Sequence, residues 1–105
     1  MKDAAAYCPR FHHAIEVLGR RWTGVILLAM HHGASRYCEI REAIPGLSDR
    51  LLSERLRELE AEGIVNREVL PEMPPAVRYS LSRKGRGLAP VFAALATWSE
   101  QYVDG

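Results

Sequence analysis

Hydrophobic residues between positions 47 and 63 recur at the spacing of a short amphipathic helix. With successive residues about 100° apart, Leu52, Leu56 and Leu59 fall on one face. The opposite face carries Arg50, Ser53, Glu54 and Arg57. A helix with an apolar back and a polar front can pack on a core while it presents side chains to a partner.

Both ends of this helix are marked in the sequence. Ser48 is a good N-cap because its hydroxyl can accept from an unpaired amide of the first turn. Leu47 and Leu52 have the spacing of a hydrophobic staple. Gly63 supplies a left-handed stop at the other end. The sequence therefore predicts a helix over 49–62.

A second, shorter apolar stripe lies just upstream and consists of Tyr37, Ile40 and Ile44. Ser35 is expected to cap this helix, and Pro45 ends it. Residues 36–44, the turn and the helix over 49–62 have the layout of a helix-turn-helix with a recognition helix. Because similar helix pairs occur in ordinary helical domains, this stretch alone does not decide for DNA binding.

The chain before residue 35 predicts two further helices. Apolar residues at helical spacing follow Pro9, so the first helix begins near Pro9 or Arg10 and stops at Gly19. The stretch 22–31 is apolar on nearly every side and ends before Gly33. That pattern is typical of a helix enclosed by others or shared with a second subunit.

After residue 63 the period changes from helical to alternating. In the stretch 77–82 apolar and polar residues face opposite sides, and 64–70 precedes it as a partner strand. The prolines within 71–75 remove amide donors and stiffen the backbone, so they predict a rigid projecting loop. A hairpin directly after a recognition helix is a wing. We therefore predict a mainly α protein with a small β-hairpin, a winged helix-turn-helix.

The last segment predicts a long helix over 83–103, with Ser82 as its cap. Its apolar stripe consists of Leu88, Val91, Leu95, Trp98 and Tyr102. Pro90 either kinks this helix or marks its true start. The helices near 9–19 and 83–103 have more apolar surface than one small core needs, so we expect them to form a dimer interface.

Composition and charge narrow the function classes. With 105 residues and 48% hydrophobic side chains, the chain is expected to form one domain, 1–105, around a single modest core. A formal charge of +1 excludes a strongly basic, non-specific nucleic-acid binder, so DNA affinity must come from locally placed Arg and Lys. Residues 1–10 lack the apolar core of a signal peptide, and the apolar run 22–30 is shorter than the roughly 20 residues of a spanning helix. We expect a cytoplasmic protein that does not enter membranes.

Short motifs along the chain carry a family resemblance. They are Cys8-Pro9, Gly19-Arg20-Arg21-Trp22, Arg36-Tyr37-Cys38-Glu39-Ile40, Ile44-Pro45-Gly46-Leu47-Ser48, Leu52-Ser53-Glu54-Arg55-Leu56, Glu62-Gly63-Ile64-Val65-Asn66-Arg67 and Pro74-Pro75-Ala76-Val77-Arg78-Tyr79. From Cys8 to Trp98 the chain resembles the HxlR-type family of bacterial winged helix-turn-helix regulators. The resemblance implies a homodimeric transcription factor, joined through its first and last helices, that binds a pseudo-palindromic operator. Arg78 stands where the family often has an acidic residue, which adds a positive charge beside the wing.

The candidate DNA contacts follow from these positions. Arg50, Ser53 and Arg57 are candidates for contacts to bases, because Arg can bind guanine edges bidentately and Ser can contact a base or a phosphate. Ser48 lies at the start of the same surface. Phosphate contacts set register and tolerate looser geometry, and their candidates are Arg36, Arg67, Arg78 and Lys84. The alternative is a winged-helix protein-interaction module that binds no DNA.

Other chemistries have little support in the sequence. The pairs His12-His13 and His31-His32 are adjacent, and neighbours on a helix point about 100° apart, so neither pair can close on one metal ion. No histidine is placed near a nucleophile with an orienting acid, and there is no glycine-rich phosphate loop. We expect no enzyme, no metal and no cofactor, and the sequence assigns no small-molecule effector.

Cys8 is the candidate for redox sensing. Its place before Pro9 puts the sulfur at the N-terminus of the first helix, where unpaired amides and the helix dipole stabilise a thiolate, and Arg10 adds positive charge. Some members of the resembled family use a cysteine at this position to sense oxidants or electrophiles. The alternative is a small buried residue. Cys38 lacks that precedent and is expected to be inert.

Overall fold

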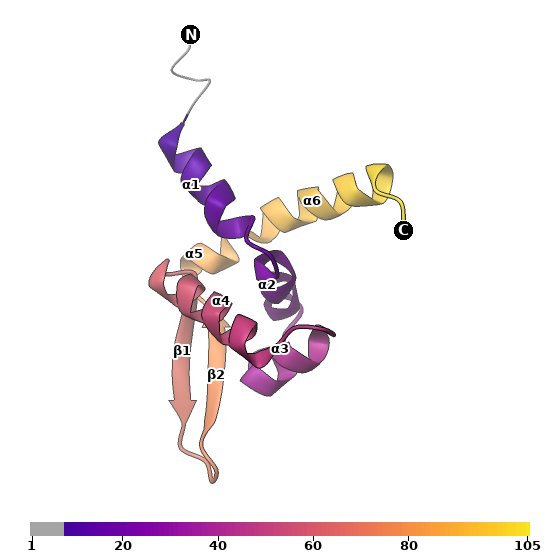
Figure 1. Cartoon of the computed structure of the whole chain (residues 1–105). Coiled ribbons are helices and arrows are strands. Elements are labelled where there is room, and N and C mark those ends of the chain that lie inside the picture. The colour runs from indigo at the N-terminus through magenta and orange to yellow at the C-terminus, as the bar shows by residue number, and fades with distance from the viewer. Residues whose placement is uncertain (1–7) are drawn as a thin grey trace.

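The computed structural model describes residues 8–105. In chain order its elements are α1 (Pro9–Leu18), α2 (Thr23–His31), α3 (Tyr37–Ala43), α4 (Asp49–Ala61), β1 (Val65–Leu70), β2 (Ala76–Leu81), α5 (Arg83–Arg86) and α6 (Ala89–Tyr102). The two strands pair antiparallel. Figure 1 shows the hairpin projecting from one end of the helical body and α6 leaving it as an arm. The predicted fold, mainly α with a hairpin wing, is confirmed.

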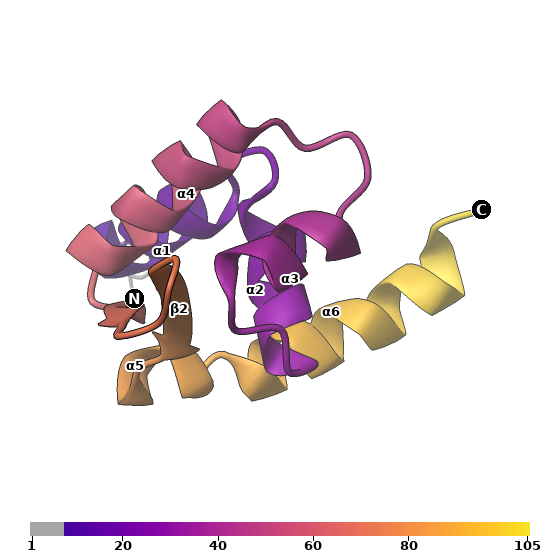
Figure 2. The same cartoon turned by 90° about the horizontal axis from the view of Figure 1, so that it is seen from below.

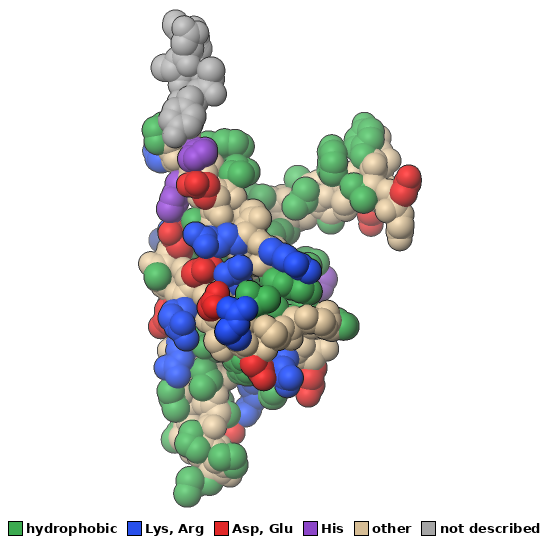
Figure 3. Space-filling view, viewed as in Figure 1, with side chains coloured by type: hydrophobic (Ala, Val, Ile, Leu, Met, Phe, Trp, Pro, Cys, Tyr) green, Lys and Arg blue, Asp and Glu red, His purple; other side chains and the backbone are tan. Residues whose placement is uncertain are grey.

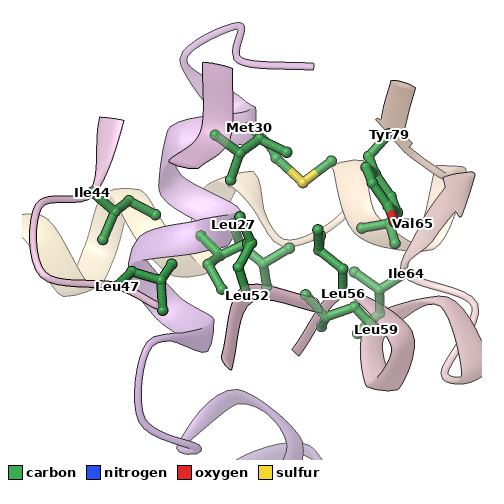
Figure 4. Packing of buried hydrophobic residues seen from close by; sticks show 12 residues of the cluster. Leu27, Met30, Ile44, Leu47, Leu52, Leu56, Leu59, Ile64, Val65 and Tyr79 are labelled. Carbon is green, nitrogen blue, oxygen red and sulfur yellow. The ribbon is translucent and has the colours of Figure 1, made fainter. Parts of the chain in front are cut away.

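The hydrophobic core lies between α2, α4 and the base of the hairpin, as Figure 4 shows. Leu52, Leu56 and Leu59 of α4 are buried in one cluster with Leu27 and Met30 of α2 and with Ile64 at the base of the hairpin. Burying one such side chain contributes about 1.5–3 kcal/mol. The leucine stripe therefore determines which face of α4 points outward.

Both predicted ends of α4 are confirmed. The Oγ of Ser48 accepts a hydrogen bond from the backbone N–H of Leu51 at 3.1 Å. Leu47, just before the cap, is buried. Gly63 follows the helix with a φ of 75°, a left-handed conformation that favours glycine. The recognition helix therefore begins and ends where its own sequence directs.

A side chain of α4 also fixes the segment that leads into α2. The side chain of Arg55 is only 14% exposed, and its Nε donates to the carbonyl oxygen of Arg21 at 2.9 Å. The guanidinium of Arg21 lies 5.0 Å from the centroid of the Trp22 ring, a cation–π contact. Trp22 has a left-handed φ of 80°, which a bulky residue adopts only where its surroundings impose it. These contacts join the entry of α2 to the recognition helix.

The predicted cap of α3 is wrong. Arg36, not Ser35, occupies the N-cap position. Glu39 satisfies the free amides instead, because its Oε1 accepts from the backbone N–H of Ser35 at 3.0 Å and of Arg36 at 2.9 Å. These bonds hold the pKa of Glu39 below its usual value, and the bond from the amide of Arg36 has the largest effect.

The single helix expected over 83–103 is wrong because this segment forms two helices, whereas the alternative that Pro90 marks the start of the last helix is confirmed. Ser82 caps the separate short helix α5, and its Oγ accepts from the N–H of Gly85 at 3.1 Å. α6 begins at Ala89, with Pro90 in its first turn. Because proline lacks an amide hydrogen, it fits the first turn, where that hydrogen would have no helical partner. Pro90 therefore marks the start of the last helix and does not kink it.

The helices α1 and α6 leave large apolar side chains in solvent. Phe11 of α1 is 67% exposed and Trp98 of α6 is 54% exposed. Neither helix has a buried residue. In Figure 3 hydrophobic side chains follow both helices, and Figure 2 shows α4 and α6 on opposite sides of α2 and α3. Within residues 8–105, no helix combines the length and apolarity needed to cross a bilayer.

Candidate nucleic-acid interface

The outer face of α4 presents the side chains predicted to contact bases. Arg50 lies in the first turn, and its side chain is 74% exposed. Its Nη1 lies 2.7 Å from Oε2 of Glu54. Arg57, further along the helix, is exposed and has no hydrogen bond or ion pair with residues 8–105. Ser53 between them is half-buried, and its Oγ lies 3.2 Å from Oη of Tyr37.

The wing is attached to α3 through both backbone and side chains. The N–H of Tyr79 donates to the carbonyl oxygen of Ser35 at 2.7 Å, and Arg36 and Arg78 form an isolated antiparallel bridge. Nη1 and Nη2 of Arg36 donate to the two carboxylate oxygens of Glu72 at 3.0 and 2.8 Å. This bidentate contact raises the pKa of Arg36 and lowers the pKa of Glu72. The direction of the wing relative to the recognition helix is therefore set by α3.

Most cations predicted to bind phosphate already have partners within the chain. Arg36 binds Glu72, and Nη2 of Arg78 donates to Oε1 of Glu68 at 2.7 Å. Nζ of Lys84 donates to a backbone carbonyl oxygen at the end of α4 at 2.7 Å. Arg67 on β1 has no such partner among the described residues. Figure 3 shows the same mixture of charges over α4 and an apolar tip on the hairpin.

Arg57 and Arg67 line one hollow between the recognition helix and the wing. Its volume is about 570 Å³. The remaining lining residues are Tyr37, Ser53, Glu60, Val77 and Tyr79. The fold thus brings together two predicted arginines from α4 and β1, whereas Lys84 lies beyond the hairpin on α5.

Cys8 and the histidines occupy other parts of the molecule. Cys8 is exposed at the N-cap position of α1, directly before Pro9. Its predicted place is confirmed and its reactivity stays a prediction. Nε2 of His13 hydrogen-bonds Oε1 of Glu62 at 3.0 Å, and Nδ1 of His31 lies 2.8 Å from a backbone carbonyl oxygen. In the part of the chain that the structure describes, no three His, Cys, Asp or Glu side chains converge as metal ligands would.

The sequence of residues 17–105 matches the family described as HxlR-like helix-turn-helix. The chain belongs to this family. It is 45% identical over 97 residues to the HTH-type transcriptional regulator YvaP of Bacillus subtilis (strain 168), a match that covers 92% of this chain and 90% of YvaP. Membership makes the chain a DNA-binding transcriptional regulator of the winged helix-turn-helix class.

Solved structures of relatives share the whole fold. The reduced form of the transcriptional regulator YodB from B. subtilis matches with a TM-score of 0.82 and 43% identity, over 93% of this chain and 96% of that one. The redox regulator HypR in its oxidised form matches with a TM-score of 0.83 and 40% identity, over 93% of this chain and 100% of that one. YodB is also known in diamide-treated and quinone-bound forms.

Three residues that organise this interface, Glu54, Tyr37 and Glu72, were not predicted from the sequence. Glu54 could have been found, because it lies four positions after Arg50 on the same helix face. The role of Tyr37, whose hydroxyl joins α3 to α4, had no signal beyond its apolar spacing. Glu72 sits in the loop of the hairpin, and only the folded chain brings it to Arg36.

Proposed function

We propose that the protein regulates transcription as a cytoplasmic homodimer that binds a pseudo-palindromic operator, and that it is not an enzyme. The observation that carries this proposal is the orientation of α4. Its leucines are buried, while Arg50 and Arg57 point away from the core. Membership in a family of transcriptional regulators supports the same function.

We assign base reading to Arg50. The first residues of a recognition helix contact base edges in helix-turn-helix proteins, and Arg50 is the exposed cation in that turn. Ser48 and Ser53 use their hydroxyls within the protein, for the cap and for Tyr37 respectively. Arg50 would exchange its contact with Glu54 for a guanine edge, which discriminates by about 1–3 kcal/mol.

The exposed apolar faces of α1 and α6 support the homodimer. Phe11 and Ile15 on α1, and Leu95 and Trp98 on α6, are each more than half exposed. A two-fold pairing of these helices would bury them and place two recognition helices about 34 Å apart, one turn of DNA. Sedimentation at micromolar concentration tests this, and a monomer with unaltered DNA binding would contradict it.

The affinity for duplex DNA as a function of salt separates a DNA-binding regulator from a protein-interaction module. Phosphate neutralisation releases counterions, so DNA affinity should fall steeply between roughly 50 and 200 mM salt. A winged-helix module that binds only proteins should show no such salt-dependent affinity. Titrating a labelled duplex by fluorescence anisotropy over this range measures the slope.

We also propose that oxidants or electrophiles act through Cys8. The cysteine is exposed at the start of α1, a helix of the proposed dimer interface, so a modification there would change the spacing of the recognition helices. The oxidised form of HypR and the quinone-bound form of YodB support this reading. Wild type, Cys8→Ser and Cys38→Ser should be treated with diamide or a quinone before operator affinity is measured. Loss in wild type and Cys38→Ser, but not in Cys8→Ser, is expected, and equal behaviour of all three would reject the idea.

A further inference from the structure

The hollow between α4 and the wing contains two arginines that have no hydrogen bond or ion pair with the described residues. Elsewhere on this side of the molecule exposed arginines contact carboxylates, as Arg36 contacts Glu72 and Arg50 contacts Glu54. Arg57 and Arg67 make no hydrogen bond or ion pair with any of residues 8–105, yet they line the same hollow. Two cations that share a hollow attract an anion more strongly than either does alone.

Arg67 occupies an unusual place on the hairpin. It pairs directly with Tyr79, and Val69 pairs with Val77. Directly opposed residues share a face of the sheet, so Arg67 lies on the face whose Tyr79 is buried in the core. An inward charge can keep an edge strand from pairing with another chain. Here it also faces a hollow that already holds Arg57 from another element.

The other polar groups of the hollow suit an oxyanion. Oη of Tyr37 can donate to Oδ1 of Asp49 at 3.2 Å and lies 3.2 Å from Oγ of Ser53. A hydroxyl has one proton, so when Tyr37 donates to Oγ of Ser53, Ser53 accepts and keeps its own proton as a donor that can turn toward the hollow. Glu60 is the one acid among the lining residues, and the two arginines leave the lining with a net positive charge.

We propose that this hollow binds one phosphate group of the DNA backbone, held by Arg57 from the recognition helix and Arg67 from the wing. The inference rests on the proposed function, since DNA supplies the phosphate. It changes the role of Arg57 from base reading to positioning. A phosphate held between α4 and β1 fixes the angle at which helix and wing sit on the duplex, and so sets the register in which Arg50 reads bases.

The first experiment compares wild type, Arg57→Ala, Arg67→Ala and the double variant on a selected operator and on random duplex DNA. Each single variant should lose roughly tenfold in affinity on both duplexes. Its salt slope should fall by about one. The double variant should be little weaker than either single one, because both side chains hold the same phosphate. Arg67→Lys, which keeps the charge, should restore the salt slope.

The second experiment locates the phosphate. Duplexes carrying a single neutral methylphosphonate at each backbone position in turn are titrated with wild type and with both single variants. At one position per half-site, the methylphosphonate should lower the affinity of wild type. At the same position it should not lower the affinity of Arg57→Ala or Arg67→Ala below the value that each variant has for unmodified DNA. Arg10→Ala, which removes an exposed charge from α1, is the matched control and should respond like wild type.

Additive losses, or two different sensitive phosphates for the two arginines, would overturn the shared site while leaving DNA binding intact. If Arg67→Ala binds DNA with unchanged affinity but aggregates, the role of Arg67 is to keep the edge strand from pairing with another chain. This result would overturn the phosphate site as well. A wild type without salt-dependent DNA affinity would instead remove the proposed function itself. Unaltered melting temperatures verify that the variants fold.

A last arm distinguishes DNA phosphate from a free phosphate compound. The DNA-free protein is titrated with inorganic phosphate and with adenosine monophosphate, and the backbone amide NMR signals of Ser53 and Arg67 are followed. A site built for the DNA backbone predicts no saturation below about 1 mM. Saturation below that concentration would assign the hollow to a free phosphate compound.

Discussion

Replacing Gly85 by Ala should destabilise the protein strongly, because α5 lies directly against the start of the hairpin. A Cβ at this position would overlap the carbonyl oxygen of Ile64 and come within 3.2 Å of Cδ2 of Leu81. The Ile64 oxygen cannot move freely, since the N–H and the Oγ of Ser82 both donate to it at 2.9 Å.

The size of the effect follows from these contacts. Overpacking a closed contact costs about 1–3 kcal/mol, and each hydrogen bond lost when the Ile64 carbonyl shifts costs about 0.5–1.5 kcal/mol. Gly85→Ala should therefore lose about 2–5 kcal/mol of unfolding free energy. Since about 1 kcal/mol shifts the melting temperature of a domain near this size by roughly 4–8 °C, the transition should fall by on the order of 10 °C or more.

Gly24 provides a matched control with the opposite expected sign. It lies in the first turn of α2, and a Cβ there would meet no atom within 4 Å apart from its chain neighbours and the backbone of the helix itself. Gly24→Ala should stabilise the helix by about 0.5–1 kcal/mol. Urea and thermal unfolding at one fixed protomer concentration, which removes the effect of dimerisation, measure both variants. A Gly85→Ala protein as stable as wild type, or a shift of both variants in the same direction, would refute the packing described between α5 and the hairpin.

Further predictions concern the cap, the titration of a carboxylate and the charge of the wing. Ser48→Ala should lose about 0.5–2 kcal/mol of stability in urea unfolding, whereas Ser80→Ala on the exposed side of β2 should not. The backbone amide of Arg36 lowers the pKa of Glu39 from its ordinary value of 4.5. The Glu39 carboxylate therefore contributes its full stabilisation above pH 4.5, and this stabilisation is lost as the pH falls through the lowered pKa. Glu39→Gln should flatten the stability profile in this acid range, and an unchanged profile would contradict the assignment. Glu72→Gln should free Arg36 and steepen the salt dependence of DNA binding by about one unit, and an unchanged slope would show that the freed guanidinium does not reach DNA.

The recognition helix could be predicted from the sequence because its determinants are local. Ser48 and Gly63 act on the backbone of their own helix ends, and the stripe of Leu52 and Leu56 defines the buried face without reference to any other element. The wing could be predicted for the same reason, because the alternation of apolar and polar residues over 77–82 and the prolines within 71–75 are also local signals. The role of Pro90 could be decided only from the structure, because a proline after a capped turn is compatible with both a kink and a helix start.

The electrostatics of the candidate interface could not be predicted in the same way. The contact of Arg36 with Glu72 joins residues far apart in the sequence, and the contact of Arg78 with Glu68 depends on the strand register. Counting charges therefore overstated the number of free cations beside the wing. The placement of Arg67 toward Arg57 likewise depends on the twist and register of the hairpin, which no short motif encodes.

Selection of bound sequences from random duplex DNA is the decisive test of a dimer that reads DNA through α4. The enriched site should be two-fold symmetric, with half-sites one helical turn apart, about 10 base pairs. Arg50→Ala should relax the preference at one position per half-site. Absence of enrichment, or enriched sites without two-fold symmetry, would contradict such a dimer.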